Sequence, residues 1–471
     1  MNNENKVNYR LLILPLVMFL SFYVFMLKFL GISAIIFTSI FYIVYFIAVP
    51  KTSRKRSGYG YFFLLTALLL SASYGIFMNP MFRVLNGIII PGSILLSLLF
   101  LQKGNLSLKF ISILKRLLFV ELISGLIASI KYPIILKGIF SSKMPSGYSK
   151  SILKGLIISL PILLVVSLLL MEADAVFKSN YQMILENLNV FEEETVFRFL
   201  ASCIFTCIVF GLLYTQTTKT VDLSKHTNFN IKLNIDVVVI FTLLILLNVL
   251  YTVFTYTQII HLYFQVPSDS PGFNYANYAR SGFFQLVFVV VINLVLITVL
   301  KSFVKSAKRN VNMLLNSLYS LTTAYTLNMV VSALYKMNLY IDTFGQTTLR
   351  IMVSVFTVLL GVLLLLLIIY IWTEKSMFIY GLCATASFYI FLNFANIDQI
   401  IAKHNLYTAD NLDFNYLMEL SEDATPAVNQ AYEDNKLSDF QYKRWSQEKF
   451  IKRENPAEHW YQYNYMNTIQ K

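Results

Sequence analysis

Residues 349–371 read LRIMVSVFTVLLGVLLLLLIIYI, with one charged residue close to the start of the run. A helix of roughly 20 such residues is long enough to cross the ~30 Å hydrocarbon core of a bilayer. Similar runs recur along the chain, which is 57% apolar and 13% charged and has a mean hydropathy of +0.62. The sequence therefore predicts an all-α, polytopic transmembrane helical bundle and excludes a soluble globular protein.

The apolar runs predict about eleven spans, within a range of about ten to twelve. They lie at 11–30, 32–49, 61–78, 84–101, 152–171, 196–214, 235–257, 283–303, 312–334, 349–371 and 377–395. The fourth run contains Pro91-Gly92 and is expected to be interrupted there. Residues 11–49 also fit one tight hairpin, which would lower the number of spans.

Lysine and arginine concentrate on alternate loops. They follow the second span in KTSRKR (51–56) and recur in 103–150, 219–232 and 301–309, whereas 172–195 is acidic. Basic loops stay on the cytoplasmic side of a membrane. The pattern predicts a multi-pass membrane protein with a cytoplasmic N-terminus and an extracytoplasmic C-terminus.

The loop 104–150 is the weakest point of this topology. Its stretch 117–130, LLFVELISGLIASI, is apolar but carries Glu121, and such a helix reaches only about 21 Å. We expect a basic amphipathic segment on the cytoplasmic face. If the stretch crossed instead, every later loop would change sides and the charge bias would invert.

Two domains follow: a transmembrane helical domain, 1–395, and a polar tail, 396–471. The tail is mixed in charge, and Ser421 followed by Glu422, Asp423 and Pro426 is typical of a helix start. We expect short helices without strands. The aromatic residues of the tail suit the headgroup layer of a membrane, and they are Trp445, Trp460, Tyr461, Tyr463 and Tyr465.

The net charge of +13 comes from basic residues scattered between spans, so it indicates anionic lipid headgroups on the cytoplasmic side rather than nucleic acid. The three cysteines fall in apolar runs and show no metal-ligand spacing. No nucleophile motif, phosphate loop or zinc helix occurs in the sequence. We therefore expect no cofactor, metal site or catalytic residue, and the protein partners stay open.

The span 312–334 is the richest in hydroxyl and amide groups, and Asn316, Ser320 and Thr323 share one helical face. One interpretation is a helix that lines a polar cavity. The other, which the sequence favours, is hydrogen bonding between packed helices, where each bond contributes about 0.6 kcal/mol.

Ionisable and polar residues gather at the predicted outer ends of the spans. They form a candidate outer-face cluster of Tyr275, Tyr278, Arg280, Gln285, Asp342, Arg350, Asn396, Asp398 and His404. Arginine and carboxylate groups at one depth predict structural ion pairs. The competing interpretation is an anion-binding site for a lipid headgroup or phosphate. Catalysis would need a base, for which His404 with Asp398 is the candidate.

These residues carry a resemblance. The stretches Tyr275 to Leu286, Leu339 to Arg350, Asn396 to Leu406 and Asp413 to Ala427 resemble the motifs of an uncharacterised bacterial family of polytopic membrane proteins, catalogued as a domain of unknown function. The resemblance is strongest over 275–428. It implies the multi-pass architecture and implies no known activity.

The sequence favours a non-enzymatic membrane protein that acts at the outer face in envelope-related assembly, sensing or lipid-linked transport. One alternative is a carrier or flippase whose cavity is lined by 312–334. Another is a membrane-embedded enzyme that acts on a lipid-linked substrate.

Overall fold

A computed structural model describes residues 9–26, 30–104, 123–135, 193–217, 236–260, 282–303, 309–373, 377–408, 413–451 and 460–465, with isolated residues between 159 and 174. Every regular element in these ranges is a helix and none is a strand, so the all-α prediction is confirmed for the described part. The chain divides into two compact units. One comprises 1–56, 101–104 and 115–223, and the other comprises 57–100, 105–114 and 224–471.

The first unit contains α1 (Tyr9–Phe25), α2 (Ser33–Ala48), the short helix η2 (Lys51–Ser53), α6 (Ser124–Ser129) and α10 (Glu193–Thr217). Within it, α6 packs closely against α10. A Cβ added to Gly211 would lie 2.0 Å from the carbonyl oxygen of Gly125, so only glycine permits this approach. Beside this crossing, the amine of Lys131 lies 5.0 Å from the centre of the Tyr214 ring.

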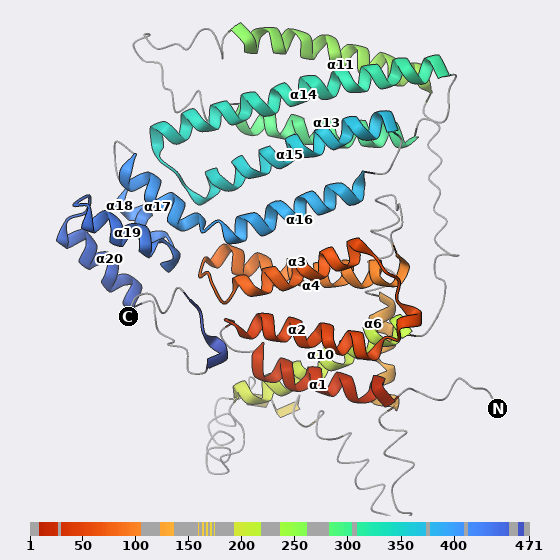
Figure 1. Ribbon diagram of the computed structural model, residues 1–471, viewed down its shortest axis with the longest axis vertical. Coiled ribbons are helices and arrows are strands. Elements are labelled where there is room, and N and C mark those ends of the chain that lie inside the picture. Colours follow the sequence, from red (N-terminus) through yellow and green to blue (C-terminus); the bar gives the residue numbers. More distant parts are fainter. Residues whose placement is uncertain are drawn as a thin grey trace, which may run out of the picture. The chain divides into compact units, whose positions relative to one another are not determined.

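The second unit stacks its long helices side by side (Figure 1). They are α3 (Gly58–Ser73), α4 (Pro80–Lys103), α11 (Val237–Gln258), α13 (Phe283–Phe303), α14 (Arg309–Phe344), α15 (Thr348–Thr373) and α16 (Phe378–Phe394). A shared apolar core joins α11, α13, α14 and α15, and α16 packs between α15 and α3. Exposed side chains such as Val239, Leu246 and Phe288 cover the outside of these helices, as expected where lipid replaces water.

Polar side chains inside this stack bond across the helices. Asn293 is fully buried; its Oδ1 accepts from the Tyr251 hydroxyl at 2.8 Å and its Nδ2 donates to Thr326 Oγ1 at 2.9 Å. Thr322 donates to Asn248 Oδ1 at 3.1 Å. These bonds tie α11, α13 and α14 together, so several polar groups of the 312–334 region serve helix packing.

A second polar cluster lies between α3, α4 and α16. Asn86 Nδ2 donates to Asn393 Oδ1 at 2.7 Å and to Ser73 Oγ at 3.1 Å, and Asn86 Oδ1 accepts from the Tyr389 hydroxyl at 2.8 Å. Because such groups have no water partner in lipid, their pairing holds the three helices in one register.

Five described helices are long and apolar enough to cross a membrane, or six if the bent pair Phe378–Phe394 and Ile397–Tyr407 is one span. They include Thr348–Thr373 and Phe283–Lys301. Four shorter apolar helices cover Arg10–Phe25, Ser33–Ala48, Gly58–Ser73 and Ser124–Ile135. The protein is membrane-embedded, while a number near eleven stays a prediction. Outside the described residues lie most of the predicted span 152–171 and most of 104–150 and 172–195.

The expected interruption at Pro91-Gly92 is wrong, because α4 runs unbroken from Pro80 to Lys103. Proline removes one backbone N–H from a helix, but membrane helices tolerate this because neighbouring groups satisfy the freed carbonyl.

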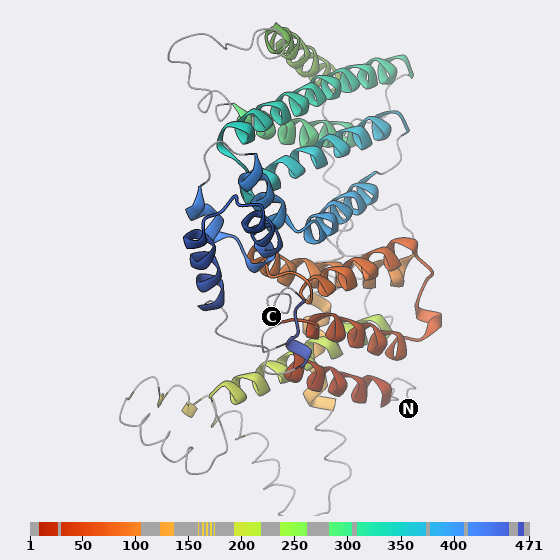
Figure 2. The same ribbon diagram turned by 60° about the vertical axis from the view of Figure 1, so that its left-hand side comes forward.

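The tail forms a small helical domain at one end of this stack (Figures 1 and 2). It comprises α17 (Ile397–Tyr407), α18 (Phe414–Glu419), η6 (Glu422–Ala424), α19 (Thr425–Glu433) and α20 (Asp439–Ile451), followed by η7 (Trp460–Gln462). The axis bends by 59° between α16 and α17. The prediction of short helices is confirmed, and Ser421 caps η6 as its position suggested.

The core of the tail domain includes Trp445, which is 2% exposed. The expectation that Trp445 rests on the membrane is therefore wrong: Trp445 belongs to a buried apolar cluster that includes Ile401, Leu417 and Val428. Trp460 and Tyr465 are 70% and 51% exposed and remain available for a headgroup layer.

Candidate functional site

The turn between α3 and α4, residues 74–79, receives bonds from distant parts of the chain. Asn79 precedes Pro80, the first residue of α4, and proline suits this position because a first-turn N–H has no intrahelical partner. Asn79 Oδ1 accepts from the N–H groups of Met81 and Phe82 at 3.0 and 3.3 Å, so the side chain caps α4. The start of α4 is thus fixed by local sequence.

Asp423 of the tail binds the same helix end. The N–H of Met78 donates to both carboxylate oxygens of Asp423 at 2.8 Å, and the N–H of Asn79 donates to Oδ2 at 2.9 Å. Asp423 is only 2% exposed. A carboxylate at a helix N-terminus is favoured by the helix dipole, so Asp423 fastens the tail to the start of α4.

Asp398 makes the second link. Its Oδ1 accepts from Asn79 Nδ2 at 2.9 Å, and its Oδ2 accepts from the Ser421 N–H at 3.1 Å and from the Ser421 hydroxyl. Ser421 Oγ accepts in turn from the Asp423 N–H at 3.3 Å. Asn79, Asp398, Ser421 and Asp423 therefore form one connected cluster, which we name the acidic junction.

The surroundings of the junction change the ionisation of Asp423. Burial raises the pKa of Asp423 from 3.8 to about 6, and the charge of Asp398 adds to the rise, whereas the hydrogen bonds from Met78, Asn79 and Ser421 oppose it. Asp423 can therefore change its charge at mildly acidic pH.

A half-buried cation, Arg83, lies beside the junction. Nη1 of Arg83 donates to the carbonyl oxygens of Tyr74 and Phe77 at 3.3 and 3.1 Å, and its guanidinium lies 5.0 Å from the centre of the Tyr74 ring. The Arg83 charge also interacts with Asp423. Arg83 thus ties the turn to α4 and offsets part of the negative charge of Asp423.

The end of the described chain fastens to the same turn. Asn464 Nδ2 donates to the carbonyl oxygens of Tyr74 and Phe77 at 2.8 and 3.2 Å, and the N–H of Tyr465 donates to the carbonyl oxygen of Gly75 at 2.8 Å. Asn464 is 1% exposed. The tail therefore holds the α3–α4 turn from two segments, at 421–423 and at 464–465.

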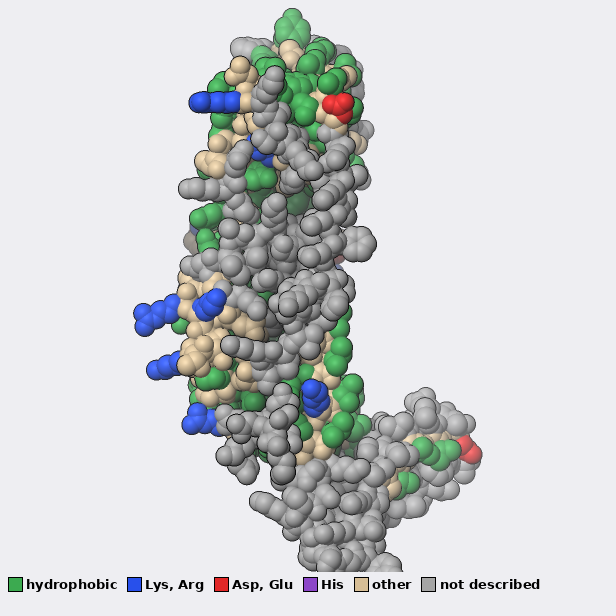
Figure 3. All heavy atoms as spheres, turned by 90° about the vertical axis from the view of Figure 1, so that its right-hand side faces the viewer, with side chains coloured by type: hydrophobic (Ala, Val, Ile, Leu, Met, Phe, Trp, Pro, Cys, Tyr) green, Lys and Arg blue, Asp and Glu red, His purple; other side chains and the backbone are tan. Residues whose placement is uncertain are grey.

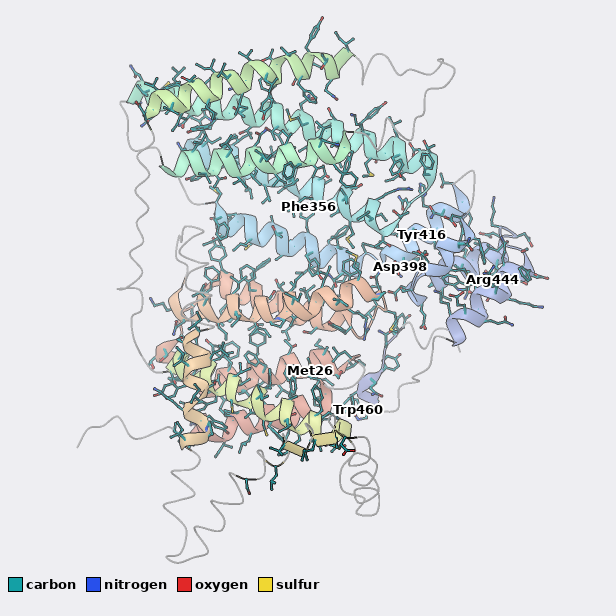
Figure 4. The ribbon with its side chains drawn as sticks, turned by 180° about the vertical axis from the view of Figure 1, so that it is seen from behind. Met26, Phe356, Asp398, Tyr416, Arg444 and Trp460 are labelled. Atoms are coloured by element: carbon teal, nitrogen blue, oxygen red, sulfur yellow. The ribbon has the colours of Figure 1, made fainter. Side chains whose placement is uncertain are left out.

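A second attachment joins the tail to the connection between α14 and α15. Asn405 of α17 bonds both backbone groups of Gln346: its Oδ1 accepts from the N–H at 2.7 Å and its Nδ2 donates to the carbonyl at 2.9 Å. The Tyr416 hydroxyl accepts from the Thr348 N–H at 2.8 Å. Figure 4 labels Asp398 and Tyr416 where the tail meets the long helices.

The described members of the predicted outer-face cluster lie on α13, α14, α15 and α17, or directly before α17. Asp398 lies in the acidic junction, and Asn396 begins α17 with a left-handed φ of 44° and caps it by accepting from the Gln399 N–H at 3.2 Å. Arg350 donates to the carbonyl oxygens of Phe344 and Gly345 at the end of α14, and its guanidinium lies 4.2 Å from the centre of the Tyr340 ring.

Asp342 and Gln285 are exposed, and His404 is half-buried, with no hydrogen-bond partner for Nδ1 among the described residues. Tyr275, Tyr278 and Arg280 lie outside the described residues. In the described part, Arg350 bonds carbonyl groups rather than Asp342 or Asp398, and Asp398 bonds Asn79 and Ser421 rather than His404.

Sequence reasoning missed Asn79 and Arg83 and gave Asp423 only a role in starting a helix. The pair Asn79-Pro80 is itself a helix-start signal, and Arg83 stands out as a charge inside an apolar run. Neither signal reveals that Asn79 bonds Asp398, 319 positions away, or that Arg83 interacts with the similarly distant Asp423.

The residues of the acidic junction lie within the part of the chain that matches a known family. A model of the family DUF4153, described as a domain of unknown function, matches residues 64–431, well over half of the chain. The chain belongs to the DUF4153 family. No curated protein and no solved structure matches it.

The DUF4153 match begins within α3 and ends within α19, so it includes the α3–α4 turn and all four residues of the acidic junction. It extends the resemblance seen in the sequence toward the N-terminus. This DUF4153 protein thus combines membrane helices and the first tail helices in one family unit, and α20 with its buried Trp445 follows that unit.

Proposed function

We propose that this DUF4153 protein is a non-enzymatic integral membrane protein of the bacterial cytoplasmic membrane, whose tail acts on the outer face in envelope-related assembly, sensing or lipid-linked transport. The observation that supports this role most directly is the use of the motif side chains. Asp398, Asn405, Tyr416 and Asp423 hold the tail domain on two helix connections. Such side chains position a domain rather than perform chemistry.

Charge supports the proposed orientation. Within the second unit, Arg309 is exposed at the start of α14, and the tail bonds Gln346 just beyond the other end of that helix. Basic side chains also stand out on the face drawn in Figure 3. Basic ends favour the cytoplasmic side and its anionic lipid headgroups. The tail would then lie on the opposite, extracytoplasmic side.

The two alternatives receive less support. A carrier with a cavity lined by 312–334 needs free polar groups, but Thr322, Thr326 and Ser320 bond to Asn248, Asn293 and Trp372 of other helices. An enzyme that used His404 with Asp398 would need contact between them, whereas Asp398 is bonded to Asn79 and Ser421.

The orientation is tested by fusing alkaline phosphatase or green fluorescent protein after residue 471 and, separately, within the loop 51–56. We expect phosphatase activity without fluorescence at 471 and the reverse at 51–56. Fluorescence at 471 would refute an outer-face role for the tail.

The role itself is tested by deleting the gene and measuring growth in bile salts and in cell-wall antibiotics. We expect a sensitised strain that both the wild-type gene and His404→Ala restore at equal membrane abundance. A strain without sensitivity would contradict the envelope role, and loss of rescue by His404→Ala alone would favour an enzyme. Lys403→Ala, an exposed neighbour on α17, is the matched control.

A further inference from the structure

The acidic junction places two buried carboxylates in one hydrogen-bonded chain. Asp398 and Asp423 are each 2% exposed, and Ser421 joins them by donating its hydroxyl to Asp398 and accepting the Asp423 N–H. Both carboxylates belong to the tail, and both bond the α3–α4 turn, through Asn79 Nδ2 and through the N–H groups of Met78 and Asn79. The junction is therefore an attachment between two parts of the unit, made largely by negatively charged acceptors.

We propose that the acidic junction is a proton-binding latch, in which uptake of one proton by its carboxylates tightens the hold of the tail on the α3–α4 turn. Proton uptake removes the repulsion between Asp398 and Asp423. It also removes the penalty of burying a second negative charge. The neutral carboxyl of Asp423 keeps a carbonyl oxygen that can accept from the turn.

The charged and titratable groups around Asp423 set the sign of this effect. Asp398 faces it from α17, Arg83 lies toward it from α4, and Tyr74 lies beside Arg83 in the turn. The uncharged donors are the backbone of Met78 and Asn79. Arg83 favours the ionised form of Asp423, and burial together with Asp398 favours the protonated form.

The sign follows from linkage. The pKa of Asp423 is about 6 in the closed junction and would return to 3.8 once the tail is released into water. The closed state therefore binds the proton more tightly, so closure strengthens as the pH falls from about 6 toward 4 and weakens as it rises. The closing equilibrium should increase by about tenfold between pH 7 and pH 5, and by about 100-fold at the acidic limit.

This latch goes beyond the proposed function and does not depend on it. It operates in purified protein whichever side of the membrane holds the tail, so the fusion experiments and the latch experiment can fail separately. If the tail is extracytoplasmic, the latch would respond to acidification of the medium.

The test is hydrogen–deuterium exchange of the full chain in lipid nanodiscs at pH 5, 6 and 7, with rates divided by the intrinsic rate at each pH. The reporter is the peptide that contains the amides of Met78 and Asn79, which donate to Asp423. We expect its protection factor to be about tenfold higher at pH 5 than at pH 7. Equal or lower protection at pH 5 would overturn the latch.

Two variants make the assignment specific. Asp423→Asn should abolish the pH dependence, and Glu419→Gln, which neutralises an exposed carboxylate on α18, should leave it unchanged. If Asp423→Asn does not fold, Asp398→Asn is measured instead, and its pH dependence should be smaller than that of wild type because the neighbouring charge is gone. Full pH dependence in both junction variants would show that other groups cause it.

Discussion

Asn79 serves two functions at once, and removing it should therefore destabilise the protein more than removal of an ordinary helix cap. Asn79→Ala deletes the Oδ1 that accepts from Met81 and Phe82 at the start of α4. A lost cap costs about 1 kcal/mol. The same substitution deletes the Nδ2 that donates to Asp398. The Oδ1 of Asp398 then loses this partner, and Asp398 is only 2% exposed.

An unsatisfied buried acceptor costs about 1–3 kcal/mol. We therefore expect Asn79→Ala to lower the free energy of unfolding by about 3 kcal/mol. Asn79→Ser separates the two contributions, because serine retains a capping oxygen but does not reach Asp398, so about 2 kcal/mol should remain. Asp413→Ala is the matched control, since Asp413 caps α18 through the Tyr416 N–H from an exposed position and should lose only about 1 kcal/mol.

The assay is titration with SDS in mixed micelles, followed by circular dichroism, with all variants in one lipid and detergent composition. The reasoning would be refuted if Asn79→Ala cost no more than Asp413→Ala. It would also be refuted if Asn79→Ser were as stable as wild type, because the bond to Asp398 would then contribute nothing.

Two further substitutions test other contacts. Gly211→Ala should sharply reduce the membrane yield of folded protein, because the added Cβ would lie 2.0 Å from the Gly125 carbonyl oxygen. Gly361→Ala is the control and should be tolerated, because its Cβ would meet its nearest atom at 3.5 Å. Equal yields of the two variants by size-exclusion chromatography would contradict this reasoning. Lys449→Met should lower the free energy of unfolding by about 2 kcal/mol in the SDS titration, because Lys449 is only 4% exposed and its amine donates to carbonyl groups at the end of α18. Lys443→Met, at an exposed position, should change it hardly at all. An unchanged stability of Lys449→Met would show that those carbonyl groups need no donor.

Hydropathy alone predicted much of the fold. The predicted span 283–303 coincides with α13, and 349–371 and 377–395 differ from α15 and α16 by a residue or two at their ends. The agreement has a physical basis, because a membrane helix must satisfy its backbone internally over a fixed apolar length. Pro91 was misinterpreted because the rule that proline ends a helix is a rule for water.

The candidate site was less accessible to sequence reasoning. Arg350 and Asp342 had the charges and the predicted depth for an ion pair, yet Arg350 bonds the carbonyl groups that α14 leaves unsatisfied at its end. Asn79 and Asp398 pair across 319 positions of sequence, a separation at which no local pattern specifies a partner. Trp445 was assigned to the membrane surface because an aromatic residue fits a headgroup layer and a domain core equally well by composition.

The motifs that carry the resemblance to the family have a common kind of location. Described motif residues lie where a helix begins or ends: Asn396 and Asp398 at the start of α17, Arg350 in the first turn of α15, and Ser421 and Asp423 before α19. Helix ends leave backbone groups unpaired, and at the edge of a bilayer water satisfies them only in part. In this chain the side chains of Asn396, Arg350 and Ser421 pair such backbone groups. Asp398 and Asp423 therefore mark how the tail is attached to the α3–α4 turn, and the charge of both carboxylates is used for that attachment rather than for chemistry on a ligand.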